Sequence, residues 1–249
     1  MSDDLTGRIV LVTGGTKGLG RGLAQAFGDA GAQVMVCARN APQPPIEDFV
    51  AADLRDASAA AGVVEATAAR FGRLDVVINN AGGSPPAAAA DVSPRFIEKI
   101  VALNLLAPFY VAQAANAVMQ DQPAGGVIIN IGSVSGRRPS PGTAAYGAAK
   151  AGLANLTASL AMEWAPRVRV NLVTVGYLET EDAGLHFGDD TGIDAVADTM
   201  PMGRLVRPAD VAQACRYLAS DAAAFVTGAD LAVHGGGELP PFLTAVSPD

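Results

Sequence analysis

The sequence predicts an α/β protein whose doubly wound parallel sheet has about seven strands, with helices on both faces. The first observation behind this prediction is that continuous apolar runs alternate with helical patterns along the whole chain. The second is that half of the 249 residues are apolar, which is enough for a large core. Folds of this class often reach this length as one domain. Because no repeat or long linker interrupts the alternation, we expect a single domain over residues 1–249.

Seven apolar runs are the strand candidates, because strands buried on both faces of a parallel sheet lack polar alternation. They are RIVLV from Arg8, QVMVCA from Gln33, FVAADL from Phe49, LDVVIN from Leu74, GVIINI from Gly126, VRVNLV from Val168 and ADLAV from Ala229. The predicted helices are 18–30, 57–71, 94–119, 144–164 and 209–220. The crossover after the second strand, NAPQPPIED, is short and rich in proline, so a loop or single turn is expected there.

The charge balance excludes several classes of partner. With 17 basic and 25 acidic residues the net charge is −8, which disfavours nucleic acid and anionic membranes. Cys37 and Cys215 lie far apart and form no CxxC, so no disulfide scaffold or metal site is expected. The start, MSDDLTGR, is no signal peptide, and charges such as Lys150 and Glu163 interrupt the alanine-rich stretches. These features predict a cytoplasmic protein.

The stretch TGGTKGLG directly follows the first strand and opens the first helix. Gly14 permits a tight turn, whereas Gly18 and Gly20 allow close approach to a pyrophosphate and close helix packing. The helix N-terminus adds free N–H groups and a positive dipole end. A plain glycine-rich connection is the alternative, at about even odds for such a motif alone. Its position after the first strand favours a dinucleotide site.

The end of the second strand indicates which dinucleotide binds. An NAD site usually has an acidic residue there for the ribose hydroxyls, but Ala38 occupies that place and Arg39 follows. Lys17 can approach the same spot from the glycine-rich turn. Either cation alone is more simply a solvated surface residue, but together they fit a ribose 2′-phosphate. The turn is therefore predicted to bind NADP(H).

YGAAK places Tyr146 and Lys150 four residues apart on one helix face. A neighbouring ammonium lowers the pKa of a phenol from about 10, so the pair could exchange a proton with an alcohol or ketone. Ser133 lies thirteen residues upstream, just past a strand end, where open α/β sheets bind ligands. Asn104 lies mid-helix among apolar residues and needs hydrogen-bond partners. A YxxxK alone is a weak signal, and Asn104 alone is more simply a satisfied core asparagine.

Together these residues resemble the short-chain dehydrogenase/reductase family, with its Rossmann fold, from Arg8 to about Gly236. The family's Asp-Leu after the third strand and Asn-Asn-Ala-Gly after the fourth are matched by Asp53-Leu54 and by residues 79–82. The matching catalytic residues are Asn104, Ser133, Tyr146 and Lys150. The cofactor contacts that the resemblance implies are Gly14, Thr16, Lys17, Gly18, Leu19, Gly20, Arg39, Asp53, Leu54, Asn80, Ala81, Gly82, Tyr146, Lys150, Gly176, Leu178 and Thr180.

The resemblance also implies a role for each catalytic residue. Tyr146 donates or accepts the proton, and Lys150 lowers its pKa and binds the nicotinamide ribose. Ser133 holds the substrate oxygen, and Asn104 helps to hold a water that relays protons to Lys150. The cofactor carries the hydride.

One motif departs from the family pattern: Val175 replaces the usual proline before Gly176, while Thr180 is retained. Since proline fixes φ, its loss is expected to loosen the entry to the substrate loop, about 177–204. The acidity of this loop indicates a solvated lid, or alternatively a lid that disfavours anions. Residues 84–86, 137–141 and this loop are expected to line the substrate pocket, with His186 a possible contact.

The resemblance thus implies an NADP(H)-dependent oxidoreductase that interconverts a secondary alcohol and a ketone on a small or hydrophobic substrate. A 3-oxoacyl-carrier reductase and a catalytically silent NADP-binding regulator are the alternatives. The small residues exposed on helices 94–119 and 144–164 allow close packing against copies of the same helices. The resemblance implies a homotetramer that forms through these helices and through a second interface near the last helix and strand, and a dimer is the alternative.

Overall fold

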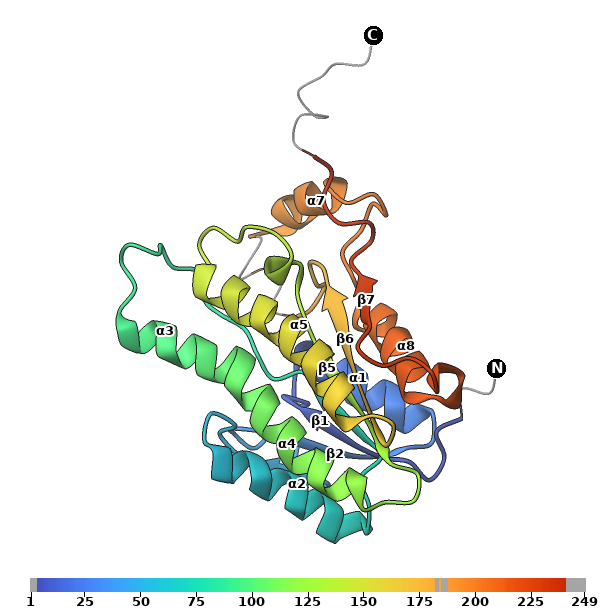
Figure 1. Ribbon diagram of the computed structural model, residues 1–249. Helices are drawn as coiled ribbons and strands as arrows, with labels where there is room; N and C mark the ends of the chain where they lie inside the picture. The colour runs from blue at the N-terminus through green and yellow to red at the C-terminus, as the bar shows by residue number, and fades with distance from the viewer. Residues whose placement is uncertain (1–3, 182–183, 185–187, 241–249) are drawn as a thin grey trace.

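The computed structural model describes residues 4–181, 184 and 188–240. Seven parallel strands form one sheet in the order β3-β2-β1-β4-β5-β6-β7, as the sequence predicts (Figure 1). The strands are β1 (Ile9–Thr13), β2 (Gln33–Ala38), β3 (Phe49–Ala51), β4 (Val76–Asn79), β5 (Gly126–Ile131), β6 (Val168–Val175) and β7 (Asp230–Val233). The order reverses between β1 and β4, which is where open α/β sheets bind ligands, outside the carboxyl ends of the strands.

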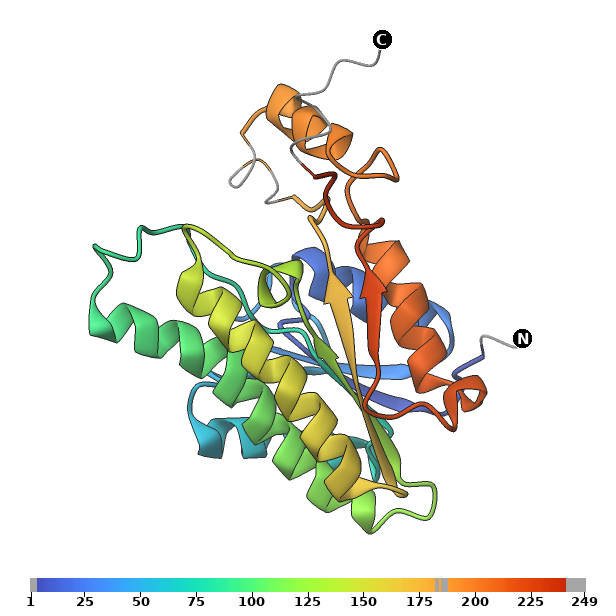
Figure 2. The same ribbon diagram turned by 45° about the horizontal axis from the view of Figure 1, so that its top comes forward.

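Helices cover both faces of the sheet (Figures 1 and 2). The α-helices are α1 (Gly18–Asp29), α2 (Ala57–Phe71), α3 (Pro94–Val101), α4 (Ala107–Gln120), α5 (Ala144–Trp164), α7 (Asp190–Asp198) and α8 (Pro208–Ala219). Short helical turns are η1 (Ala102–Leu106), η2 (Val134–Gly136) and η3 (Asp221–Ala223). Helices α1 and α8 share one core with the sheet, and α2, α4 and α5 share the other. Successive residues of β1 alternate between the cores, because side chains of a strand point to opposite faces.

The predicted loop after β2 is confirmed, because residues 39–48 form no helix. The single helix predicted over 94–119 is wrong in detail: the π-helix η1 separates α3 from α4. The substrate loop also contains a helix, α7, which begins where the Asp189 carboxylate accepts a hydrogen bond from Gly192 N at 3.2 Å. His186, a possible substrate contact, lies outside the described residues.

By length and composition alone, Pro94–Gln120 is apolar enough to cross a membrane. In this fold it comprises α3, the π-helix η1 and α4, and it is partly buried. Val111, Ala115 and Met119 are fully buried in the core that α4 shares with α2, α5 and the sheet. One side of this stretch therefore packs against the protein's own core, whereas Ile97 and Leu106 are exposed.

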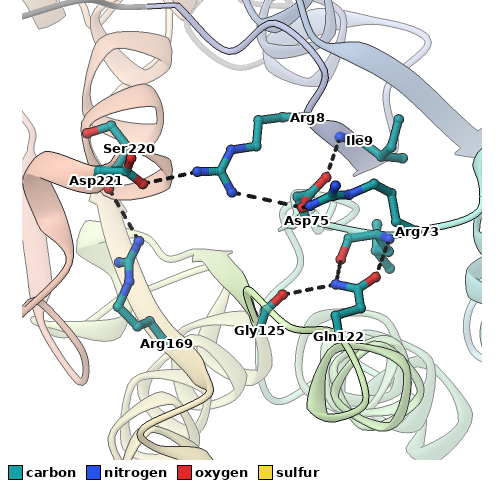
Figure 3. A network of polar contacts seen from close by, with 10 residues as sticks. Arg8, Ile9, Arg73, Asp75, Gln122, Gly125, Arg169, Ser220 and Asp221 are labelled. Atoms are coloured by element: carbon teal, nitrogen blue, oxygen red, sulfur yellow. Dashed lines mark hydrogen bonds and ion pairs between the residues drawn. The ribbon is translucent and has the colours of Figure 1, made fainter.

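The amino edge of the sheet, where the strands begin, carries a network of charged side chains (Figure 3). Asp75, 1% exposed, accepts hydrogen bonds from Ile9 N at 2.8 Å and from Arg73 Nε at 3.1 Å. Arg8 joins Asp75, at 3.9 Å, to Asp221, at 3.0 Å. The network ties the starts of β1 and β4 to the turn after α8.

Candidate active site

The glycine-rich turn between β1 and α1 has a backbone that only glycine fits well. Gly14 and Gly18 have φ of +65° and +52°, in the left-handed region that other residues rarely adopt. A Cβ on Gly20 would lie 2.2 Å from the Gly14 carbonyl oxygen, so α1 packs directly against the turn. Leu19, also predicted at the cofactor site, points into the core. The geometry has the tight turn and the close helix packing predicted for these glycines, and their approach to a pyrophosphate stays a prediction.

Residues that follow β4 form hydrogen bonds with this turn. The Asn80 side-chain amide donates to the Thr13 carbonyl at 2.9 Å and to the Gly14 carbonyl at 3.3 Å. The Thr13 hydroxyl in turn accepts from the backbone N–H groups of Asn80 and Ala81, each at 3.0 Å. Asn80, predicted as a cofactor contact, is thus a residue that holds the turn in shape. Thr13 shares that task, which the motif alone did not reveal.

The ends of β1, β2 and β3 bring the predicted adenosine contacts to one corner. Gly14 N donates to Cys37 O at 2.8 Å, so the glycine-rich turn lies against the end of β2. Arg39, just beyond β2, and Lys17, at the start of α1, are both exposed. Asp53 accepts from Arg55 Nε at 2.9 Å, and this bond, with a smaller contribution from Arg39, lowers the pKa of Asp53 to about 2. Leu54 beside it is buried.

Tyr146, on the first turn of α5, meets Ser133 at the end of β5. Burial raises the pKa of Tyr146 above its usual value, and the hydrogen bond with Ser133 opposes that rise. The expected lowering of the Tyr146 pKa by Lys150 is therefore not found. Lys150 Nζ lies 5.7 Å from the centre of the tyrosine ring, and desolvation of the phenolate is the largest cause of the shift. Ser133 also caps η2, its hydroxyl accepting from Ser135 N at 3.2 Å.

Lys150 is buried one turn further along α5. Its Nζ donates to the Ile131 carbonyl at 2.8 Å, and burial lowers its pKa to about 8. A Cβ on Gly82 would lie 3.4 Å from this Nζ and 2.7 Å from Asn104 Oδ1, so the bare backbone at Gly82 separates the two side chains. The lysine therefore lies beside the loop after β4, among the predicted catalytic groups.

Asn104 is fully buried at the centre of the π-helix η1. Its side-chain amide donates to the Ile100 carbonyl, four residues back, at 2.9 Å and to the Gly83 carbonyl at 3.0 Å. Its Oδ1 accepts from Gly83 N at 2.8 Å. The wider π turn is closed by Ala107 N donating to Ala102 O. Asn104 thus finds the partners that a polar amide in this apolar helix requires, and it fixes the loop beside Lys150.

Val175, where the family has proline, is a buried residue of β6 paired with Val233 of β7. Gly176 follows, and a Cβ there would lie 3.0 Å from the His234 backbone. Leu178 pairs with Val206 in a parallel bridge. The chain that leads from β6 to Thr180 is therefore held by sheet-like pairing, and Thr180 approaches Gly18 of the turn. Thr16 is half-buried in that turn.

Two of the segments expected to line the substrate pocket meet through Arg138. It donates to the Tyr177 hydroxyl at 2.8 Å and pairs with Glu238 after β7. Arg137 pairs with Asp230 of β7, and its expected place in the substrate pocket stays a prediction. A hollow of about 530 Å³ beside residues 135–141 is lined by the α5 face that carries Ala144, Ala148 and Ala151. That face is opposite Tyr146 and Lys150, so this hollow is distinct from the reaction site.

Comparison with known proteins agrees with this geometry. A family model described as enoyl-(acyl carrier protein) reductase matches residues 14–238. The chain belongs to the short-chain dehydrogenase/reductase family. Two curated members are 36% identical to it: 3beta-hydroxysteroid dehydrogenase 1 of Eggerthella lenta, over 97% of both chains, and 3-oxoacyl-(acyl-carrier-protein) reductase of Escherichia coli, over 92% of this chain and 97% of that one. The chain is therefore an oxidoreductase of alcohol- and ketone-type substrates that uses a nicotinamide cofactor.

A crystal structure of another short-chain dehydrogenase/reductase superposes with a TM-score of 0.87. It comes from Beutenbergia cavernae, was studied as a candidate NAD(P)-dependent gluconate 5-dehydrogenase and holds NADP at low occupancy. It is 34% identical and covers 95% of this chain and 98% of its own.

The turn fits the nicotinamide cofactor of the short-chain dehydrogenase/reductase family. Gly18 leaves room on the Cβ side, since a Cβ there would meet only Thr180 Cγ2, at 3.9 Å. Three contacts of the site lie outside the predicted residues: the Gly83 backbone, which binds Asn104, the Ile131 carbonyl, which accepts from Lys150, and Glu181 at the turn. A backbone group has no sequence signal. In the sequence Glu181 is one acidic residue of the predicted lid, and in the structure its carboxylate accepts from Gly18 N at 2.9 Å.

Proposed function

We propose that the protein is an NADP(H)-dependent oxidoreductase that interconverts a secondary alcohol and a ketone on a small or hydrophobic substrate. The observation that carries the cofactor preference is the corner formed by Ala38, Arg39 and Lys17. Arg39 directly follows β2, where an NAD site would present an acidic residue, and Lys17 lies in the turn that contacts the end of β2 through the bond from Gly14 N to Cys37 O. The NADP in the Beutenbergia cavernae structure also supports this preference.

Substitution of Arg39 tests the cofactor preference. Arg39→Ala should weaken NADPH binding by about 1.5–3 kcal/mol, the range for a hydrogen bond to a charged group, and should change NADH binding little. Calorimetric titration measures both. Arg167→Ala is the matched control, because Arg167 is an exposed arginine at the amino edge of the sheet. Equal or tighter binding of NAD(H) by the unmodified protein would refute the proposed preference.

In the proposed reaction the Tyr146 hydroxyl gives a proton to the ketone oxygen, or takes it from the alcohol in the reverse direction. When bound, the nicotinamide supplies or accepts the hydride. Ser133, already hydrogen-bonded to Tyr146, holds the substrate oxygen. Lys150 would hold the nicotinamide ribose, and Asn104 keeps the loop beside Lys150 in place.

The names of two relatives support this reaction class, because a hydroxysteroid dehydrogenase and a 3-oxoacyl reductase both describe the exchange of a hydroxyl and an oxo group. The second name favours 3-oxoacyl-carrier reduction as the alternative function. A panel of ketones and alcohols, with a 3-oxoacyl thioester among them, distinguishes the two when absorbance at 340 nm is followed with NADPH or NADP⁺. Turnover of any member would also exclude a catalytically silent regulator.

We further propose a cytoplasmic homotetramer, with a dimer as the alternative. Ala148, Ala151 and Ala158 form an exposed stripe of small residues along α5, and Met162 on the same helix is 85% exposed. Phe225, between α8 and β7, is fully exposed. Light scattering should therefore give about four times 25.1 kDa, and Ala151→Glu should lower that mass. A mass near 25.1 kDa for the unmodified protein would show that these faces stay unpaired. The buried, free cysteines suit a reducing compartment.

A further inference from the structure

Helix α1 begins without a cap from its own sequence. Lys17, at its N-cap, makes no side-chain cap hydrogen bond, and the first turn contains no acidic residue. Helix α2, by contrast, is capped locally, since Asp56 accepts from Ala59 N at 2.9 Å. Because the first N–H groups of a helix have no partner within it, those of α1 are available to an acceptor from elsewhere.

That acceptor is Glu181, which lies 163 residues away in the sequence. Gly18 N donates to Glu181 Oε1 at 2.9 Å, and Arg21, one turn along α1, pairs with the same oxygen at 3.5 Å. Thr180 brings the loop against the turn, with its Cγ2 3.9 Å from the position of a Gly18 Cβ. A carboxylate from the loop after β6 therefore accepts the hydrogen bond of a backbone N–H in the glycine-rich turn.

A carboxylate at this point chemically resembles a phosphate. Both present anionic oxygens to the N–H groups and the positive dipole end of a helix. In the proposed function, the pyrophosphate of NADP(H) binds at this same turn. One N–H cannot donate fully to both anions, and two anions that share the place repel each other.

We infer that Glu181 competes with the cofactor pyrophosphate for Gly18 N, so that NADP(H) binding displaces the Glu181 carboxylate. The inference rests on the cofactor site of the proposed function. Glu181 then lowers the affinity for NADP(H), and its return to the amide assists release of the spent cofactor. The expected effect is about three- to fivefold in affinity, because the Glu181 side chain is 44% exposed and exposed ion pairs are weak.

Glu181→Gln tests the competition, because it keeps the side-chain length and removes the charge. Glu179→Gln is the matched control: Glu179 lies two residues earlier, is 53% exposed and pairs with Arg207 at 2.9 Å. Isothermal titration of wild type and both variants uses three probes. NADPH and ADP-ribose contain a pyrophosphate, whereas adenosine 2′-monophosphate carries only the ribose phosphate.

Glu181→Gln should bind NADPH and ADP-ribose about three- to fivefold more tightly than wild type. Its affinity for adenosine 2′-monophosphate should not change, and Glu179→Gln should match wild type with all three probes. Unchanged or weaker binding of ADP-ribose by Glu181→Gln would overturn the inference. An equal gain with all three probes, or an equal gain in Glu179→Gln, would also overturn it, because the cause would then be net charge.

The probes also separate this inference from the proposed function. If wild type prefers NADH to NADPH but Glu181→Gln still gains affinity for ADP-ribose, the inference stands and the NADP preference is wrong. If NADPH is preferred but no variant gains affinity, the preference stands and the inference is wrong. Failure of every probe to bind would overturn both.

Discussion

The two edges of the same sheet differ in whether a buried charge has a counter-charge beside it. At the amino edge, Asp75 is buried among Arg73, Arg8 and the Ile9 amide, so its charge is matched (Figure 3). At the carboxyl edge, Lys150 is buried as deeply. Among the described residues, its ammonium has one hydrogen-bond acceptor, the Ile131 carbonyl, and no carboxylate within ion-pair distance.

This difference separates charge that stabilises the fold from charge that can react. If a buried and fully paired ion changed its protonation state, its partners would be left without their counter-charge. A buried ion left without a counter-charge has a displaced pKa, as Lys150 does at about 8. Displaced pKa values in a cleft are typical of catalytic groups. The comparison predicts that substitutions at the carboxyl edge affect activity and those at the amino edge affect stability.

The largest expected effect is the loss of activity in Tyr146→Phe. The substitution keeps the ring and removes the hydroxyl. Turnover should therefore fall by about 10²–10⁴-fold or more, since this range is the usual contribution of general acid–base catalysis. The thermal midpoint should change little. Steady-state kinetics with the best ketone of the substrate panel measures the loss. Tyr217→Phe, on the exposed side of α8, is the control and should keep full activity. Residual activity above about a tenth would mean that another group donates the proton.

The second effect concerns Asp75→Asn at the amino edge. Removing this charge leaves Arg73 and Arg8 without their shared buried partner, and we expect the free energy of unfolding to fall by about 2–4 kcal/mol. Turnover per folded molecule should be unchanged. Urea unfolding followed by circular dichroism measures the loss.

Asp221→Asn is the control for that experiment, because Asp221 pairs with the same Arg8 but is 95% exposed. Its loss should be below about 1 kcal/mol. If both variants lose the same stability, burial does not distinguish the two carboxylates and the comparison of the edges fails.

The smallest effect is a gain of stability in Lys150→Met. Burial lowers the lysine pKa from 10.5 to about 8, which corresponds to roughly 3 kcal/mol at neutral pH. Loss of the hydrogen bond to Ile131 offsets about 1 kcal/mol of this. The variant should therefore be about 2 kcal/mol more stable than wild type at pH 7, and inactive.

The pH dependence of that gain is a sharper test. Between about pH 8 and 10.5 the unfolded chain holds the lysine proton and the folded chain does not, so wild-type stability rises with pH through this window. The advantage of Lys150→Met should shrink over the same range. Urea titrations of both proteins at several pH values give the difference. A constant difference would mean that Lys150 titrates alike in both states.

The sequence was sufficient for features that depend on local chain geometry. The strands, the glycines of the turn and the spacing of Tyr146 and Lys150 belong to this group, because each follows from a periodicity or a φ requirement. It was insufficient where distant segments meet. The contact of Glu181 with Gly18 depends on where the loop after β6 closes. The direction of the Tyr146 pKa shift depends on burial, which no residue spacing reports.

The π-helix η1 also constrains the length of the chain. A π turn holds one residue more than an α turn, and here that residue lets Asn104 reach the Gly83 backbone while α4 keeps its packing on α2. Deleting one residue from Ala102–Leu106 would rotate α4 relative to α3, and its apolar face would leave the core. Loop 40–48, which carries no helix, would absorb the same deletion at its surface. In a family tree, η1 should stay constant in length and keep Asn104, while its other residues vary.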